Sequence, residues 1–176
     1  MLHLVGSHAL SPLLMGLLLC LGAALTVESP VQTWQRVDTA LASATPAAQA
    51  MFRAFKSWLM QQKNEVHLQM IKIADLTNDV NDLDGALRIY AIYLKKQATA
   101  TDAFWRLFDD ATNSGTTTDL KIVLPVLEAS KEAMAFFPDG VPIADGIVET
   151  SQTTGDGTTD TTTGDGPNGF MLVGAA

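Results

Sequence analysis

The chain contains few of the residues that enzymes and metal sites most often use. Its only cysteine is Cys20, and of its three histidines only His67 lies beyond the apolar N-terminal region. Once that region is removed, the chain offers no thiol nucleophile, no cysteine-type zinc site and no multi-histidine metal site. No GxSxG motif accompanies His67, and the apolar spacing around it predicts a helix, so we expect no Ser-His-Asp triad. We predict no catalytic residue, no metal ligand and no cofactor.

Positive charge and phosphate-binding glycine loops are also scarce. From Val31 to Arg106 there are nine Lys and Arg against seven Asp and Glu, whereas from Leu107 to the end there are two against eleven. The net charge of the whole chain is −8. An acidic C-terminal third repels phosphate, and no basic stripe offsets it, so we expect no nucleic-acid partner. The glycines lie in turns and in the tail, where they form no phosphate-binding loop.

The first thirty residues contain a long apolar run. From Ala9 to Val27 there is no charged residue, and the small residues Gly22, Ala23 and Ala24 follow the apolar core. This order is typical of a secretory signal peptide, so we predict residues 1–24 as a signal peptide and a secreted, extracellular protein. The start of the chain lacks Lys and Arg, and the run is almost long enough to span a bilayer. A retained anchor, with membrane contact through residues 9–27, is therefore the alternative.

Cys20 lies inside this apolar run. A lipid-modified cysteine needs a small residue just before it, whereas here Leu18 and Leu19 precede it. We therefore interpret Cys20 as a small hydrophobic residue of the leader. A cysteine-free mature chain has no disulfides and must be stabilised by packing, which favours a helical domain of reasonable size.

Two helices are predicted at the start of the body. The first runs from about Val31 to Ala42, with Ser29-Pro30 just ahead of it and an apolar face made of Trp34, Val37 and Leu41. Thr45 is a candidate N-cap for the second helix, with Pro46 as its first residue. One face of this second helix is strongly apolar and consists of Met51, Phe52, Phe55, Trp58 and Leu59.

The next segment has a heptad-like pattern. Apolar residues between Val66 and Leu94 recur at alternating spacings of four and three, which is typical of a coiled-coil or bundle helix. Gly85 interrupts the pattern, so this segment is either one long helix hinged near Gly85 or two helices joined by a turn. Further helices are predicted over 104–111, behind Thr101-Asp102, and over 118–137, with a kink or start at Pro125.

The predicted fold is therefore an all-α bundle of four to five helices over residues 25–149. Residues 150–176 are predicted to be a disordered tail, because most of the segment is Thr, Gly and Asp. The sequence TTGDG occurs in it twice, and this composition resembles a flexible, O-glycosylated stalk more than a calcium-binding repeat. A GPI signal beginning near Gly164 is a further alternative, although its spacer and apolar end are short.

Several acidic residues resemble parts of known sites. Asp82 and Asp84 precede Gly85 as in a calcium loop, but Val80 and Ala91 occupy the positions that need a carboxylate. Asp75, Asp79 and Asp82 would share one helical face, which is typical of a solvated surface. Glu128 and Glu132 would lie one turn apart, as paired catalytic carboxylates do, but that spacing is also ordinary on helix surfaces.

The predicted second helix allows two further interpretations. The segment FRAFKSWLM, with Arg53, Lys56 and Lys63, could lie on a membrane surface, although we favour a core position for its aromatic residues. Met51, Met70 and Met134 could line an apolar cavity or simply fill gaps in the core. The leading hypothesis is a non-enzymatic protein, secreted or at the cell surface, that acts by protein–protein contact. The alternatives are a carrier of a small apolar ligand and a membrane-anchored surface protein.

Overall fold

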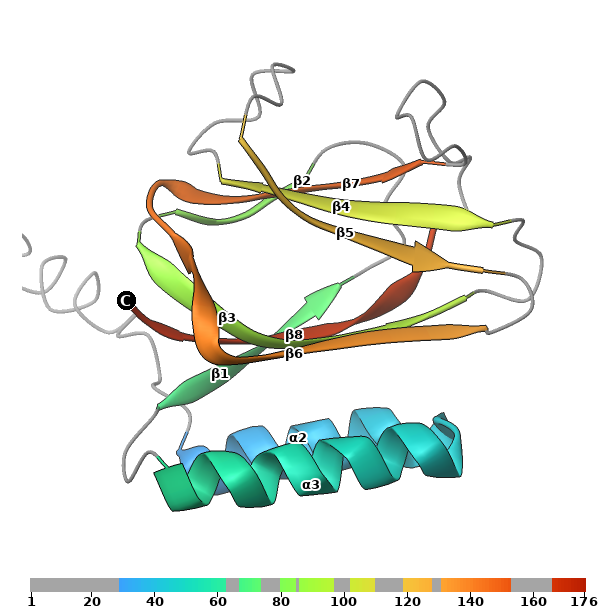
Figure 1. Cartoon of the computed structure of the whole chain (residues 1–176), viewed down its shortest axis with the longest axis vertical. Helices are drawn as coiled ribbons and strands as arrows, with labels where there is room; N and C mark the ends of the chain where they lie inside the picture. Colours follow the sequence, from blue (N-terminus) through green and yellow to red (C-terminus); the bar gives the residue numbers. More distant parts are fainter. Residues whose placement is uncertain are drawn as a thin grey trace, which may run out of the picture.

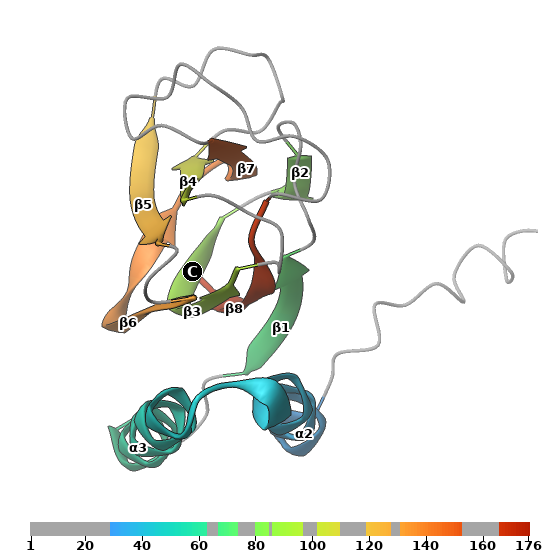
Figure 2. The same ribbon diagram turned by 90° about the vertical axis from the view of Figure 1, so that its right-hand side faces the viewer.

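The protein is a three-layer structure of two helices and two β-sheets (Figures 1 and 2). The computed structural model describes residues 29–62, 67–73, 80–84, 86–96, 102–109, 119–127, 131–152 and 166–176. Within them the predicted all-α helical bundle is wrong, because eight strands form two antiparallel sheets and only two α-helices are present. The predicted signal peptide, residues 1–24, lies outside the described residues. No helix in the described part of the chain is both long enough and apolar enough to cross a membrane.

The first predicted helix is confirmed as α2, Pro30–Ala40. Ser29 caps it: the Ser29 side chain accepts from the backbone N–H of Gln32 at 3.3 Å, and the Gln32 side chain accepts from the backbone N–H of Ser29 at 3.0 Å. This reciprocal capping box satisfies two backbone donors at the helix start. The predicted apolar face is buried against the sheet, as expected for a helix covering a core.

The second predicted helix is confirmed as α3, Pro46–Gln62, and a short 3₁₀ turn, η1 (Leu41–Ser43), joins it to α2. The predicted N-cap is also correct, since the hydroxyl of Thr45 accepts from the backbone N–H of Ala48 at 3.3 Å. Of the predicted apolar face, Phe52, Phe55 and Leu59 are buried. The face that these residues form belongs to a helix on a sheet and not to a helix in a bundle.

The rest of the described chain is β-structure. The strands are β1 (Leu68–Ile73), β2 (Val80–Asp84), β3 (Leu87–Lys95), β4 (Ala103–Asp109), β5 (Leu120–Val126), β6 (Glu132–Ile143), β7 (Gly146–Gln152) and β8 (Asn168–Ala175). The predicted long helix between Val66 and Leu94 is therefore wrong, together with its coiled-coil seam. Gly85 itself lies outside the described residues, but strands precede and follow it.

Burial on both faces explains why β3 resembled a helix. Every residue from Ile89 to Leu94 is buried, because α2 and α3 cover one face of this strand and the second sheet covers the other. A strand buried on both sides has a continuous apolar run instead of an alternating one, and such a run cannot be distinguished from a helix by periodicity. Leu87 and Leu94 then matched a heptad spacing by coincidence.

The helices predicted after Thr101 are also wrong, because β4, β5 and β6 occupy those segments. In β4 the buried residues Ala103, Trp105 and Leu107 alternate with half-buried ones, which is the period of a strand. Pro125 lies in β5, which pairs only with β4 at the edge of its sheet. Proline is tolerated there because an edge strand has one side without sheet hydrogen bonds.

The strand order is that of a jelly roll. Sheet A has the order β1-β8-β3-β6 and sheet B the order β2-β7-β4-β5. Strands pair as β1 with β8, β2 with β7, β3 with β6 and β4 with β5, so the chain resembles one long hairpin that has been rolled up. The further pairs β3–β8 and β4–β7 join these strand pairs into two four-stranded sheets. This order defines the eight-stranded jelly roll.

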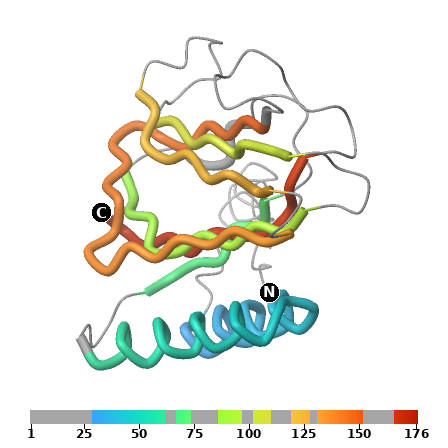
Figure 3. Tube along the Cα trace, turned by 45° about the vertical axis from the view of Figure 1, so that its right-hand side comes forward, coloured from blue at the N-terminus to red at the C-terminus, as the bar shows by residue number. Residues whose placement is uncertain are grey.

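Figure 3 shows the helical layer and the two sheets one above another, and two apolar cores hold these layers together. The first lies between the helices and sheet A, where Phe52 packs its ring 4.8 Å from that of Phe136 and 5.4 Å from that of Phe170, centroid to centroid. The second lies between the sheets and includes Trp105 and Leu107. The large apolar residues are therefore divided between two cores, one on each face of sheet A.

The predicted disordered tail is wrong where the structure describes it. Thr150 lies inside β7, and β8 is an interior strand of sheet A, between β1 and β3. Gly169 is required in β8 because a Cβ there would overlap the backbone carbonyl oxygen of Tyr93. Both copies of TTGDG lie outside the described residues except for Gly166.

Candidate binding groove between helices α2 and α3

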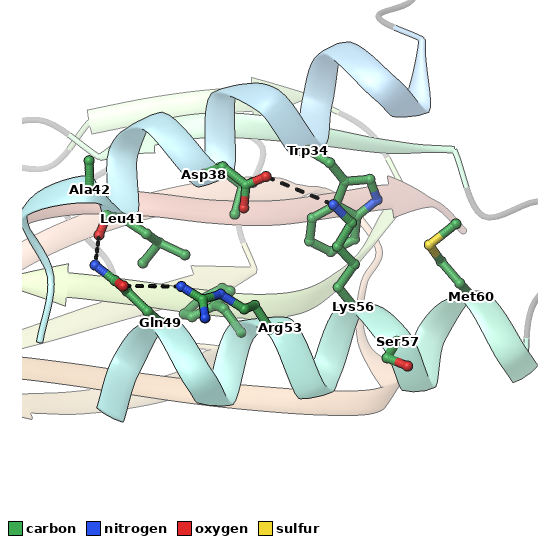
Figure 4. Close-up of a pocket in the computed structure, with 11 residues that line it drawn as sticks. Trp34, Asp38, Leu41, Ala42, Gln49, Arg53, Lys56, Ser57 and Met60 are labelled. Atoms are coloured by element: carbon green, nitrogen blue, oxygen red, sulfur yellow. Dashed lines mark hydrogen bonds and ion pairs between the residues drawn. The ribbon is translucent and has the colours of Figure 1, made fainter. Parts of the chain in front are cut away.

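The groove lies between α2 and α3, and side chains of both helices line it (Figure 4). It has a volume of about 610 Å³. Its floor consists of Trp34, Val37, Leu41 and Phe52, all of them buried residues that also belong to the first core. The groove therefore has a floor that is tied to the sheet and cannot move without disturbing the core.

Polar side chains from both helices form the upper walls of the groove. Lys56 reaches across from α3, with its ammonium 3.9 Å from the carboxylate of Asp38 and 5.0 Å from the ring centre of Trp34 (Figure 4). Gln49 donates to the carbonyl oxygen of Leu41 at 3.0 Å and accepts from Arg53 at 3.2 Å. An apolar floor below charged walls can hold an amphipathic ligand.

The helical layer differs in charge from the rest of the protein. Between residues 30 and 62 there are three basic residues, Arg36, Arg53 and Lys56, and one acidic residue, Asp38, which is a net charge of +2. The whole chain carries −8, so the remaining residues carry −10. Two of these three basic residues, Arg53 and Lys56, line the groove. The groove is thus a positive site on an acidic protein.

Several apolar side chains are exposed on the helical layer. Met51 is 48% exposed and Met60 is 63% exposed, and Val31 at the start of α2 is exposed as well. Ala47, Ala50 and Ala54 are also exposed on α3, and α3 contains no acidic residue. Single apolar side chains are normal on a protein surface, so only those that line the groove, such as Met60, bear on binding there.

A polar network fixes the start of α3 to sheet A. The carboxylate of Glu132 accepts from the hydroxyl of Thr45 at 2.7 Å, from its backbone N–H at 3.0 Å and from the hydroxyl of Tyr93 at 3.0 Å. Burial of the phenol raises the pKa of Tyr93, and the hydrogen bond and negative charge of Glu132 raise it further. Glu132 is therefore a structural hydrogen-bond acceptor here. Glu128 lies outside the described residues, so no carboxylate pair is formed within them.

This network predicts that the variant Glu132→Gln is less stable than the wild type. The amide keeps one acceptor oxygen but loses the charge that strengthens three hydrogen bonds, so we expect the free energy of unfolding to fall by about 1–2 kcal/mol in urea titrations. Asp139→Asn is the matched control, because Asp139 is exposed in β6. Equal stability of the two variants would contradict the role of Glu132 as an anchor of α3.

The buried carboxylate of Asp109 stabilises the connection between the two sheets. Asp109, at the end of β4, accepts from the backbone N–H groups of Ala144 at 2.9 Å, Asp145 at 2.8 Å and Gly146 at 3.5 Å, and Lys121 lies 3.5 Å away. Burial raises the pKa of the Asp109 carboxyl, but these hydrogen bonds and the charge of Lys121 outweigh it and lower the pKa overall. Asp109 thereby fixes the turn at which the chain passes from sheet A to sheet B.

The remaining residues considered from the sequence do not form a site together. His67 is an exposed residue just before β1, so its predicted helical position is wrong. Asp82 and Asp84 lie in β2, whereas Asp75 and Asp79 lie outside the described residues. Among the residues that the structure describes, no group of three or more His, Cys, Asp or Glu could hold a metal ion.

The three methionines that could have lined a cavity or filled gaps in the core are not brought together. Met51 is exposed on α3, whereas Met70 and Met134 are half-buried and pack against the first core from sheet A. Met60, which the sequence did not single out, lines the groove instead. Lys63 lies outside the described residues.

No protein-family model, curated protein or solved structure matches this chain.

Some residues that are important for the fold carry no signal in the sequence. Asp109 is one, and Glu149 is another: it is fully buried in β7 and accepts from the indole N–H of Trp105 at 3.0 Å. Acidic residues are normally exposed, so only the tertiary structure reveals that these two are buried.

Proposed function

We propose that this protein is a non-enzymatic binding protein, secreted or at the cell surface, that contacts a partner protein through the helical layer. The observation that carries the proposal is the groove between α2 and α3, with its apolar floor and its two cationic residues, Arg53 and Lys56. Met60 is 63% exposed and lines the groove, whereas Met51 is 48% exposed elsewhere on the same helix. An apolar patch with a polar rim suits recognition of a protein surface.

The groove also supports the alternative of a small-ligand carrier. Its volume of about 610 Å³ falls within the range of small-molecule pockets, about 300–1,000 Å³. A carrier usually encloses most of its ligand, whereas this groove lies at the surface of the helical layer (Figure 4). Met51 is exposed outside the groove and would have no role in a carrier, whereas Met60 lines the groove and could contact either kind of partner.

The membrane-anchored alternative changes the location and not the contact surface. The apolar run ends at Val27, only two residues before Ser29, where α2 is capped. If the run is retained as an anchor, about 7 Å of extended chain separates it from the helical layer. The start of α2 would then lie close to the bilayer, and partners would have to approach the groove near the membrane surface.

Peptide display tests the proposed contact surface. A library of random peptides is selected on the full chain, and the selected peptides are then measured against Met51→Lys/Met60→Lys. We expect binding to weaken at least about tenfold, because one charge would be placed in the groove lining and another on the exposed surface of the same helix. The matched control is Leu120→Lys/Val123→Lys, since Leu120 (45% exposed) and Val123 (41%) lie on β5 in sheet B.

The proposal requires that the control variant keeps the binding of the wild type. If the β5 variant loses binding and the α3 variant keeps it, the contact surface lies on sheet B and the proposal is wrong. A selection that enriches no peptide above background also contradicts it. A small apolar ligand that binds the groove and leaves selected peptides bound elsewhere would favour the carrier.

A further inference from the structure

We propose that the partner places an acidic amphipathic helix in the groove between α2 and α3. This inference rests on the proposed function and names the chemistry of the partner at the same site. The helix would set apolar side chains on the floor and carboxylates against Arg53 and Lys56. Three observations carry it: the sign of the charge, the shape of the groove walls, and the bonding of the two cations.

The charge of the helical layer indicates the sign of the charge that a partner should carry. The layer has a net charge of +2 on a chain of −8, so it attracts an acidic segment while the rest of the protein repels it. The layer therefore favours an acidic partner over a basic one. A second copy of the chain is a poor occupant, because a symmetric contact would bring two positive layers together.

The groove walls have the spacing that receives a helix. One wall is formed by Asp38 on α2 and Ala42 in η1, and the other is the row Gln49, Arg53 and Ser57 on α3. The α3 row has a spacing of four residues, which forms the kind of ridge against which another helix packs. From Gln49 to Met60 the lining extends about 16 Å along α3, or three helical turns. A partner helix of about three turns would fill it with residues at i, i+4 and i+7.

The two cations can each accept a new carboxylate. In the described structure the guanidinium of Arg53 makes one hydrogen bond, to the side-chain oxygen of Gln49, so it keeps donors for a bidentate contact. Lys56 is paired with Asp38 at 3.9 Å, and Asp38 is exposed, so this ion pair is weak. A carboxylate in the groove could replace Asp38 as the partner of Lys56 while the ammonium of Lys56 stays over the ring of Trp34.

Three designed peptides of about four turns each test the inference. They share one face of leucines and differ at the flanking positions, which are glutamate, glutamine or lysine. Affinities are measured by fluorescence anisotropy on the full chain. We expect the glutamate peptide to bind at least about tenfold tighter than the glutamine peptide, and the lysine peptide to bind weakest. The preference should decrease as the salt concentration rises.

Two double variants test whether the preference for the glutamate peptide depends on the cations of the groove. In Arg53→Gln/Lys56→Gln the glutamate and glutamine peptides should bind equally. In the control Arg36→Gln/Lys72→Gln, which removes two exposed cations outside the groove lining, the preference should remain. The indole N–H signals give the position independently: that of Trp34 should shift on binding, whereas that of Trp105, fully buried in the second core, should not.

Each other outcome overturns the inference. Equal affinities of the glutamate and glutamine peptides on the wild type would remove the acidic partner, while display peptides that need Met51 and Met60 would still support the proposed function. An equal loss in both double variants would mean general attraction and no groove contact. Binding of phosphatidylserine vesicles that depends on Arg53 and Lys56, without peptide preference, would assign the surface to a lipid membrane.

Discussion

A chain that ends at Pro167 should not fold. The deletion removes β8, which lies between β1 and β3 in sheet A, so both neighbouring strands lose a hydrogen-bonding partner. It also removes four consecutive buried side chains, Phe170 to Val173, which alternate between the two cores. At about 1.5–3 kcal/mol for each, their burial contributes about 6–12 kcal/mol. That is as large as the whole stability of a typical domain, about 5–15 kcal/mol.

Circular dichroism and urea unfolding measure this effect. We expect the truncated chain to lose its strand signal and its cooperative transition. The control is removal of Ala175 and Ala176 alone, because both residues are exposed and the apolar part of β8 is kept. A chain ending at Pro167 that still unfolds cooperatively, close to the midpoint of the full chain, would show that β8 is not part of the folded core.

Asp109→Ala should destabilise the protein by about 3 kcal/mol. The carboxylate makes charge-assisted hydrogen bonds to three successive backbone N–H groups at the turn after β6, each worth about 1.5–3 kcal/mol when the acceptor is charged. Water can replace part of them, because Ala144 and Asp145 are exposed. Asp109→Asn keeps one acceptor oxygen and should lose about half as much. Urea unfolding at neutral pH provides the comparison.

The effect of Asp109 should depend on pH in a defined direction. The pKa of this carboxyl is lower in the folded protein than its ordinary value of 3.8, so ionisation stabilises the fold. The contribution is complete above the ordinary value and is lost as the pH falls through the folded one. The stability difference between wild type and Asp109→Asn should therefore be constant from about pH 5 to 7 and shrink below pH 4. A difference that grows on acidification would contradict the assigned hydrogen bonds.

The two helices could be predicted because their signals are local. Ser29 and Thr45 act on backbone groups within three residues of themselves, and the two prolines are favourable in a first turn. The apolar residues of each helix recur on one face because a single layer, sheet A, covers them. Even so, the interpretation of that face as a bundle contact was wrong, because a helix buries the same stripe against a helix or a sheet.

The strands could not be predicted from spacing, because their partners are distant in the sequence. β1 pairs with β8 about a hundred residues later, and β3 is buried on both sides, so neither has the alternation of a half-exposed strand. In the C-terminal segment the short run of Phe170 to Val173 was outweighed by the Thr, Gly and Asp residues around it. Only the tertiary structure shows why this run is needed: it forms the strand between β1 and β3.

The candidate site divides in the same way. The sequence by itself determined that α2 and α3 are helices with apolar faces, that Arg53 and Lys56 lie among aromatic residues, and that the negative charge lies elsewhere. Those properties follow from residue type and local spacing. The tertiary structure decided that the two helices lie side by side on sheet A, that a groove separates them, and that Asp109 and Glu132 are anchors. Such properties depend on contacts between residues far apart in the chain, and no local pattern encodes them.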